Sequence, residues 1–64
     1  MMITVDFKII SSEDDRFNEG DLVQVHTWTN HNGVFIDNLT TAQSISCLSD
    51  EYTEWREITK YEEV

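Results

Sequence analysis

Proline is absent from this chain, and glycine occurs only twice in 64 residues. Linkers and low-complexity segments are rich in these residues, so the composition argues against both. A single cysteine excludes an intrachain disulfide and favours a reducing compartment, which we expect to be the cytoplasm. The longest apolar runs span only a few residues, which excludes a transmembrane helix, and the first ten residues lack the features of a signal peptide.

Basic residues are also scarce. Four lysines and arginines stand against 13 aspartates and glutamates, so the formal net charge is −9 at pH 7. Proteins that bind nucleic acid or anionic membranes neutralise phosphate with lysine and arginine, and we therefore expect no direct binding to DNA, RNA or membrane. A chain of this length forms one small domain with one compact core. It has no room for a separate cofactor domain, and we expect no cofactor.

The chain does contain short apolar runs, separated by polar turns about every ten residues. Alternation of apolar and polar residues over 2–10 predicts a half-buried strand. The dipeptide Asn32-Gly33 predicts the tight turn of a hairpin. Further strands are expected over 22–28, 33–37, 44–48 and 53–58, with a short closing strand near the end. This series predicts an all-β or mainly β protein, built as a small barrel or sandwich.

The C-terminal segment allows a second interpretation. Tyr52, Trp55, Ile58 and Tyr61 recur every three residues, which is close to the period of a helix. A helix within residues 50–64 therefore stays open beside the strand expected over 53–58. The residues expected to be buried together are Val23, Val25, Val34, Ile36, Ile45 and Trp55.

The segment Gly20-Asp21-Leu22-Val23-Gln24-Val25 resembles the opening strand of SH3-like barrels of the KOW and Tudor kind. The later strands of such barrels are similar to Gly33–Ile36, Ile45–Asp50, the Trp-containing Thr53–Arg56 and Tyr61–Val64. The resemblance implies a barrel of about five strands over residues 20–64, with residues 1–10 as an added N-terminal strand and 11–19 as an acidic loop.

Short proteins that end in a Trp strand and an acidic Glu-Val tail are similar to small tailed-phage early proteins. The nucleic-acid-binding members of the SH3-like fold carry a basic face, which this chain lacks.

The chain contains the residue types needed for three kinds of functional site, but the positions of these residues argue against each kind. His26, His31 and Cys47 are of the types that bind zinc, yet their spacing matches no ligand pair. Cys47 lies in an expected strand, where a cysteine is more often a core residue than a nucleophile. The carboxylate pairs lie in polar turns, where they stay solvated and lack the raised pKa of a general acid. We therefore expect no catalytic residue and no metal site.

The acidic charge is the strongest indication of function. On a domain of this size the acidic side chains crowd the surface and repel one another. Such a surface either serves solubility or complements a basic nucleic-acid-binding groove, with carboxylates in the place of phosphates. The leading hypothesis is a non-catalytic, phage-type protein that binds and inhibits a host nucleic-acid-handling protein in the host cytoplasm. The predicted partner-binding residues are Glu13, Asp14, Asp15, Glu19, Asp21, Asp50, Glu51, Glu54 and Glu57, with Phe35 as an exposed aromatic.

Two other modes of interaction stay open. An aromatic groove is one of them, and it would hold a peptide or a methylated cation. Its residues are Trp28, Phe35, Tyr52, Trp55 and Tyr61. The other mode is assembly, because an N-terminal strand at the edge of a sheet is open to pairing with a second copy in a homodimer.

Overall fold

The computed structural model describes every residue from Met1 to Val64. Its elements are β1 (Met2–Ser12), β2 (Leu22–Trp28), β3 (His31–Asn38), β4 (Gln43–Leu48), α1 (Ser49–Glu57) and β5 (Thr59–Glu63). The five strands form one sheet in the order β4-β3-β2-β1-β5, and all its pairs are antiparallel. With 58% of residues in strands and 14% in a helix, the prediction of a mainly β protein is confirmed. No helix has the length and apolar character needed to cross a bilayer.

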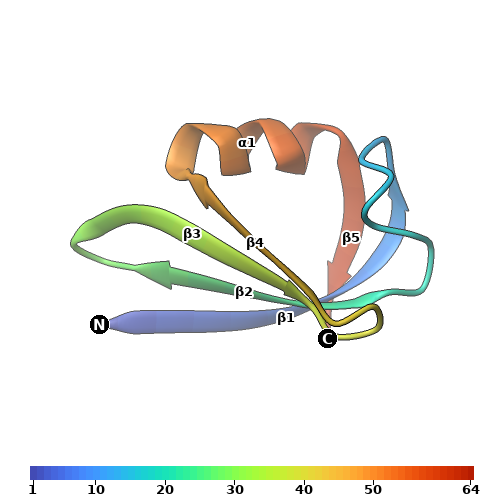
Figure 1. Cartoon of the computed structure of the whole chain (residues 1–64), viewed down its shortest axis with the longest axis horizontal. Helices are drawn as coiled ribbons and strands as arrows, with labels where there is room; N and C mark the ends of the chain where they lie inside the picture. Colours follow the sequence, from blue (N-terminus) through green and yellow to red (C-terminus); the bar gives the residue numbers. More distant parts are fainter.

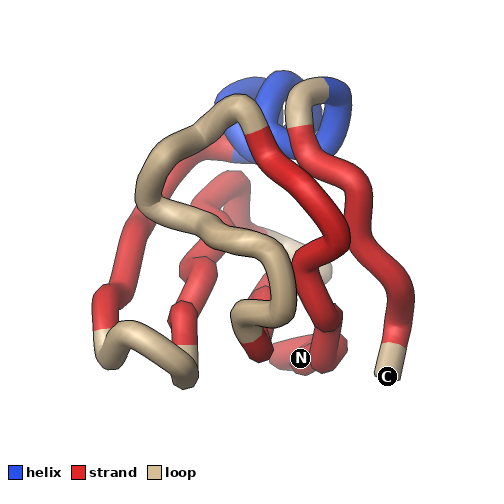
Figure 2. Tube along the Cα trace, turned by 90° about the vertical axis from the view of Figure 1, so that its right-hand side faces the viewer, coloured by secondary structure: helices blue, strands red, loops and turns tan.

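The longest strand, β1, lies inside the sheet. Its residues 2–8 pair with β2, and its residues 7–12 pair with β5 on the other side. The register with β5 shifts between Ile9 and Ser11, which marks a bulge that bends the strand. The sheet curls as a result, and α1 lies across its concave side, as Figure 1 and the turned view in Figure 2 show. The N-terminal strand is therefore an interior strand of the sheet.

The hairpin between β2 and β3 turns earlier than the Asn-Gly dipeptide predicts. Trp28 pairs with His31, so the turn consists of Thr29 and Asn30. Gly33 lies within β3, and its φ is not positive. A Cβ atom there would lie 2.7 Å from Cε1 of His31. The glycine thus leaves room for the imidazole ring and does not form the turn.

Residues 49–57 form a helix where the resemblance implies a Trp-containing strand. The prediction of a strand over 53–58 is wrong. The helical interpretation of residues 50–64 is confirmed as far as Glu57, and the expected short closing strand follows as β5. Glu51 Oε1 accepts the Leu48 backbone N–H at 2.9 Å and so caps the first turn. Asp50 and Glu51 in the first turn and Arg56 in the last turn suit the helix dipole. Trp55 is the only fully buried residue of α1 and attaches the helix to the sheet.

The hydrophobic core lies between α1 and the concave face of the sheet. It consists of Phe7, Ile9, Phe17, Val23, Val25, Val34, Ile36 and Trp55. Five of the six predicted core residues are among these, and Ile45 packs against them partly buried. Phe17 is absent from the predicted core because it lies in a polar loop. Its ring folds under α1, with its centroid 5.2 Å from that of Trp55.

Candidate functional site

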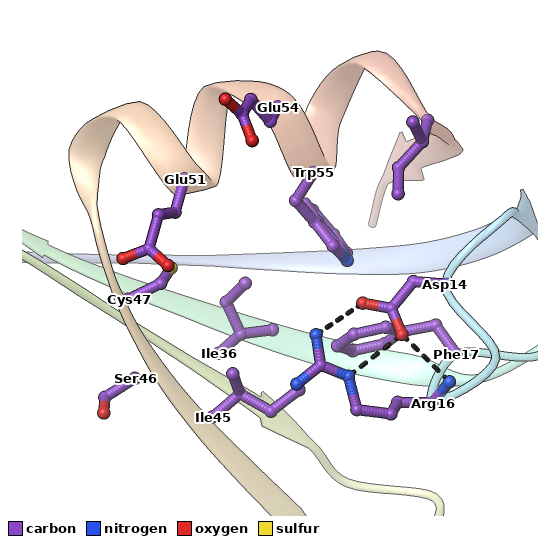
Figure 3. A pocket seen from close by; sticks show the side chains of 11 residues that line it. Asp14, Arg16, Phe17, Ile36, Ile45, Ser46, Cys47, Glu51, Glu54 and Trp55 are labelled. Atoms are coloured by element: carbon purple, nitrogen blue, oxygen red, sulfur yellow. Dashed lines mark hydrogen bonds and ion pairs between the residues drawn. The ribbon is translucent and has the colours of Figure 1, made fainter.

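A cleft of about 370 Å³ opens between α1, β4 and the loop that follows β1 (Figure 3). Ligand-binding pockets commonly have volumes of about 300–1,000 Å³, so this cleft has a suitable size. Its apolar lining consists of Phe17, Ile36, Ile45, Trp55 and Ile58. Its polar lining consists of Asp14 and Arg16 from the loop, Ser46 and Cys47 from β4, and Glu51 and Glu54 from α1.

Asp14 and Arg16 form a bidentate ion pair in this lining. Arg16 Nε donates to Asp14 Oδ1 at 2.9 Å, and Arg16 Nη2 donates to Asp14 Oδ2 at 2.6 Å. These hydrogen bonds lower the pKa of Asp14 and raise that of Arg16. Because the pair has no net charge, the negative charge of the cleft comes from Glu51 and Glu54.

The structure brings together acidic residues that are far apart in the sequence. A smaller hollow beside the cleft is bordered by Glu13 and Glu57, and Ile58 lines both. The acidic residues of α1 follow one another at the spacing of a helix turn. They share one side of the molecule with the loop, and we call this surface the acidic rim. The acidic rim consists of Glu13, Asp14, Glu51, Glu54 and Glu57.

The other predicted acidic residues lie outside the acidic rim. Asp15, Glu19 and Asp50 are exposed but line neither hollow. Asp21 is only 5% exposed, and its Oδ2 accepts hydrogen bonds from Asn38 Nδ2 at 2.8 Å and from the Asn18 N–H at 2.9 Å. This carboxylate is buried and is held inside the protein, which argues against the prediction that Asp21 binds a partner.

Phe35 lies on the convex face of the sheet, and it lines neither the cleft nor the hollow between Glu13 and Glu57. It is 42% exposed, and its ring meets that of Trp28 edge-on with centroids 5.3 Å apart. Three other aromatic rings stack on the concave side instead, namely Tyr52, Trp55 and Tyr61. The predicted aromatic groove is therefore split between the two faces.

A chain of polar side chains crosses the convex face. Thr4 Oγ1 lies 3.0 Å from His26 Nδ1, and His26 Nε2 lies 2.9 Å from Asp37 Oδ2. Hydrogen bonds from Ser44 and from His26 lower the pKa of Asp37. The order of hydroxyl, imidazole and carboxylate is that of a nucleophilic triad. These groups, however, lie on the opposite face from the cleft, and we interpret them as a ladder that stabilises the pairing of β1, β2 and β3.

Cys47 lies on the concave side and lines the cleft. Burial raises the pKa of its thiol, and the negative charges of Glu51 and Asp50 raise it further. The thiol therefore stays protonated at neutral pH, whereas the thiolate is the nucleophile and metal ligand. His26 points to the other face, and no group of three His, Cys, Asp or Glu side chains is placed to hold a metal ion.

Two functional features of the cleft are missing from the predicted site. The first is the pairing of Arg16 with Asp14, for which a spacing of two residues in a polar loop is a weak local signal. The second is Trp55, whose indole Nε1 is buried without a hydrogen-bond partner. The sequence predicts that this side chain is buried, but not that its nitrogen lacks an acceptor.

Comparison with known proteins identifies no relative. No family model matches the chain, and no curated protein or solved structure is significantly similar to it. The resemblance to SH3-like barrels and to phage early proteins therefore stays a prediction.

Proposed function

We propose that this protein is a non-catalytic binding protein whose acidic rim docks on a basic, nucleic-acid-binding surface of another protein and blocks it. The observation that carries the proposal is the position of Glu13, from the loop, beside the acidic side chains of α1. Carboxylates carry the same sign of charge as phosphates. A surface with many carboxylates therefore complements a groove lined with lysine and arginine, as nucleic acid does. If the gene belongs to a phage, host nucleases and polymerases supply such surfaces.

The basic side chains leave most of this charge uncompensated. Arg16 is paired with Asp14. Arg56 Nε donates to Tyr61 Oη at 3.0 Å, and its guanidinium lies 5.6 Å from the centre of the Tyr52 ring. Lys60 is the one cation in the hollow between Glu13 and Glu57. The acidic rim thus keeps an excess of negative charge that a basic partner would neutralise.

Matched charge reversal tests this proposal. Replacement of Glu13, Glu54 and Glu57 by Lys adds two charges at each site and changes the net charge from −9 to −3. Replacement of Asp6, Glu62 and Glu63 by Lys produces the same net charge and leaves the acidic rim intact. All six residues are exposed, and none caps α1.

The measurement is the affinity for a purified basic partner, isolated from host lysate with this protein as bait, at low and at high ionic strength. We expect the rim variant to lose binding, the control variant to keep most of it, and salt to weaken the wild-type complex steeply. A duplex oligonucleotide should displace the protein from its partner. Equal losses in the two variants, or no competition by the duplex, would contradict the proposal.

The convex aromatic pair supports a second candidate, a peptide-binding or assembly module. Its basis is the exposure of Phe35 beside the half-buried Trp28. Binding through this pair would be nearly insensitive to salt and would be lost in Phe35→Ala, whereas binding through the acidic rim would survive that substitution.

A further inference from the structure

Trp55 carries the one buried side-chain polar atom that has no hydrogen-bond partner, its indole Nε1. The residue is 6% exposed and lines the cleft. Figure 3 shows the ring extending from α1 into the cleft, with its nitrogen on the side of Asp14 and Phe17. The face of Phe17 is a much weaker acceptor than an oxygen atom. Since nearly all buried donors have an acceptor, this end of the cleft lacks an oxygen that a ligand would supply.

Hydrogen-bond donors and acceptors lie at opposite ends of the cleft. At one end, the indole N–H of Trp55 lies on the side of the ion pair in which Arg16 holds Asp14 through Nε and Nη2. At the other end lies Glu51, next to Cys47 (Figure 3). The hydrogen bond from the Leu48 N–H to Oε1 fixes the position of the Glu51 carboxylate.

An apolar floor connects these two ends. Ile36 and Ile45 lie between them in Figure 3 and line the cleft. A matching ligand therefore has a cation at one end, an aliphatic stem in the middle and an oxygen acceptor at the other end. A basic residue within a peptide has this arrangement, because its own main-chain carbonyl lies at the base of its side chain.

We propose that the cleft binds one arginine residue of the partner, with the guanidinium on Glu51 and the main-chain carbonyl on the indole N–H of Trp55. This inference rests on the proposed function and names the chemical group that the acidic rim recognises. Arginine fits better than lysine because its guanidinium is less strongly hydrated and donates two parallel hydrogen bonds to a carboxylate. Its stem packs on apolar surface as the floor requires.

Entry of the carbonyl requires a small movement of Arg16. Nε1 of Trp55 has almost no exposed surface. The side chain of Arg16 is 53% exposed, so it has room to shift toward solvent. The Asp14 side chain, at 11% exposed, stays in place as its partner.

The two tryptophans make this proposal directly measurable. In a ¹H–¹⁵N spectrum the chain has two indole signals, from Trp28 and Trp55, and Trp28→Phe assigns them. The probe is a five-residue peptide, blocked at both ends, with one arginine flanked by glycines. We expect saturable movement of the Trp55 signal and none of the Trp28 signal. The same peptide with citrulline, which is neutral and of the same shape, should bind about tenfold more weakly or worse.

A matched pair of variants separates charge from folding. Glu51→Gln keeps an oxygen that caps α1 but removes the charge, and we expect it to weaken binding of the arginine peptide by about tenfold. Glu62→Gln makes the same change at an exposed position of β5, outside the cleft and the acidic rim, and affinity should stay within about twofold of wild type.

The Trp55 signal can also contradict the proposal. No movement with the arginine peptide, equal movement with the citrulline peptide, or no effect of Glu51→Gln would overturn the arginine site. If a basic partner binds through the acidic rim while the Trp55 signal stays still, the arginine site is wrong and the proposed function stands. If the peptide binds as expected but no partner competes with a duplex oligonucleotide, the arginine site stands and the proposed function is wrong.

Discussion

At the scale of single residues, Trp55 combines an anchoring role with a proposed binding role. Its ring stacks on those of Tyr52 and Tyr61, with an interplanar angle of 18° in both pairs, and meets Phe17 edge-on. These contacts come from α1, β5 and the loop, so one side chain joins three segments. Its removal should therefore affect both stability and the shape of the cleft.

We expect Trp55→Ala to lower the free energy of unfolding by about 3–5 kcal/mol, because it deletes the only fully buried side chain of α1. Urea unfolding followed by far-UV circular dichroism measures the change. Ile45→Val, at the border of the core, is the control, and it should cost about 0.5–1.5 kcal/mol. A loss in Trp55→Ala no larger than in the control would show that other contacts attach the helix.

Asp14 should make stability depend on pH. Its hydrogen bonds with Arg16 hold its pKa below the ordinary value of 3.8. A lowered folded-state pKa means that the contribution to stability is present above the unfolded-state pKa and is lost as the pH falls through the folded-state value. Unfolding of wild type and Asp14→Asn, measured over a series of pH values, should therefore differ at neutral pH and converge in acid. Parallel curves would show that the pair contributes nothing.

Side-chain burial could be predicted from the sequence in strands, where apolar and polar residues alternate. Alternation along β3 predicts both the exposure of Phe35 and the burial of Val34 and Ile36, and the structure agrees. Asp21 deviates because it lies in the loop before β2 and is buried with hydrogen bonds, one of them from Asn38 of β3. The residues next to an aspartate in the sequence do not indicate a hydrogen bond with a residue so far away in the chain.

At the scale of elements, β1 has one stretch that is paired on one side only. Its partner β5 reaches no further than Phe7, and the Val64 N–H bonds to the Asp6 carbonyl. Residues 2–5 keep a free edge, with Met2 54% and Ile3 43% exposed. A free apolar edge is a template for pairing with another chain. Strand pairing in the predicted homodimer could therefore involve only this short stretch of β1.

We expect weak, concentration-dependent dimers in sedimentation experiments, and expect Ile3→Lys to abolish them because a charge on the edge blocks strand pairing. The substitution lies at an exposed position and should leave the fold intact, which circular dichroism can verify. A wild-type protein that stays monomeric at high concentration would refute dimerisation through β1.

The strands were largely predictable and the helix was not, for a physical reason. Alternation over four or more residues specifies a strand that is buried on one face, as in β1 and β2. The period of three from Tyr52 to Tyr61 fits a helix, yet only its first part lies in α1, and the same segment also fits a short strand. The acidic rim could not be predicted for another reason. It combines residues of a loop and of α1, and these come together only because the loop packs under the helix. That packing is set by Phe17 and by the buried pair Asp21–Asn38.

At the scale of the whole molecule, the net charge of −9 opposes the compact state. The Debye length is about 10 Å at 0.1 M salt, which is close to the radius of gyration of 11.0 Å. Added salt therefore screens charges across the entire protein and not only between neighbours. A basic partner would relieve the same repulsion when it binds.

We expect the melting temperature to rise as sodium chloride is increased from very low concentration. The variant with Glu13, Glu54 and Glu57 replaced by Lys should show a smaller rise, since it carries less net charge. Sucrose, which stabilises without screening charge, is the control and should affect both proteins alike. A salt response of the same size in both proteins would argue against self-repulsion.

The pairing of β1 with β5 has a consequence for how the protein is made. Phe7 lies opposite Glu63, so residues that are far apart in the sequence must meet before the sheet is complete. During synthesis, the second half of β1 has no strand partner on that side until residues 59–63 have left the ribosome. Contacts this distant in sequence slow folding. The sheet should thus be completed only after β5 has emerged, and until then the nascent chain depends on staying soluble, which an abundance of carboxylates favours.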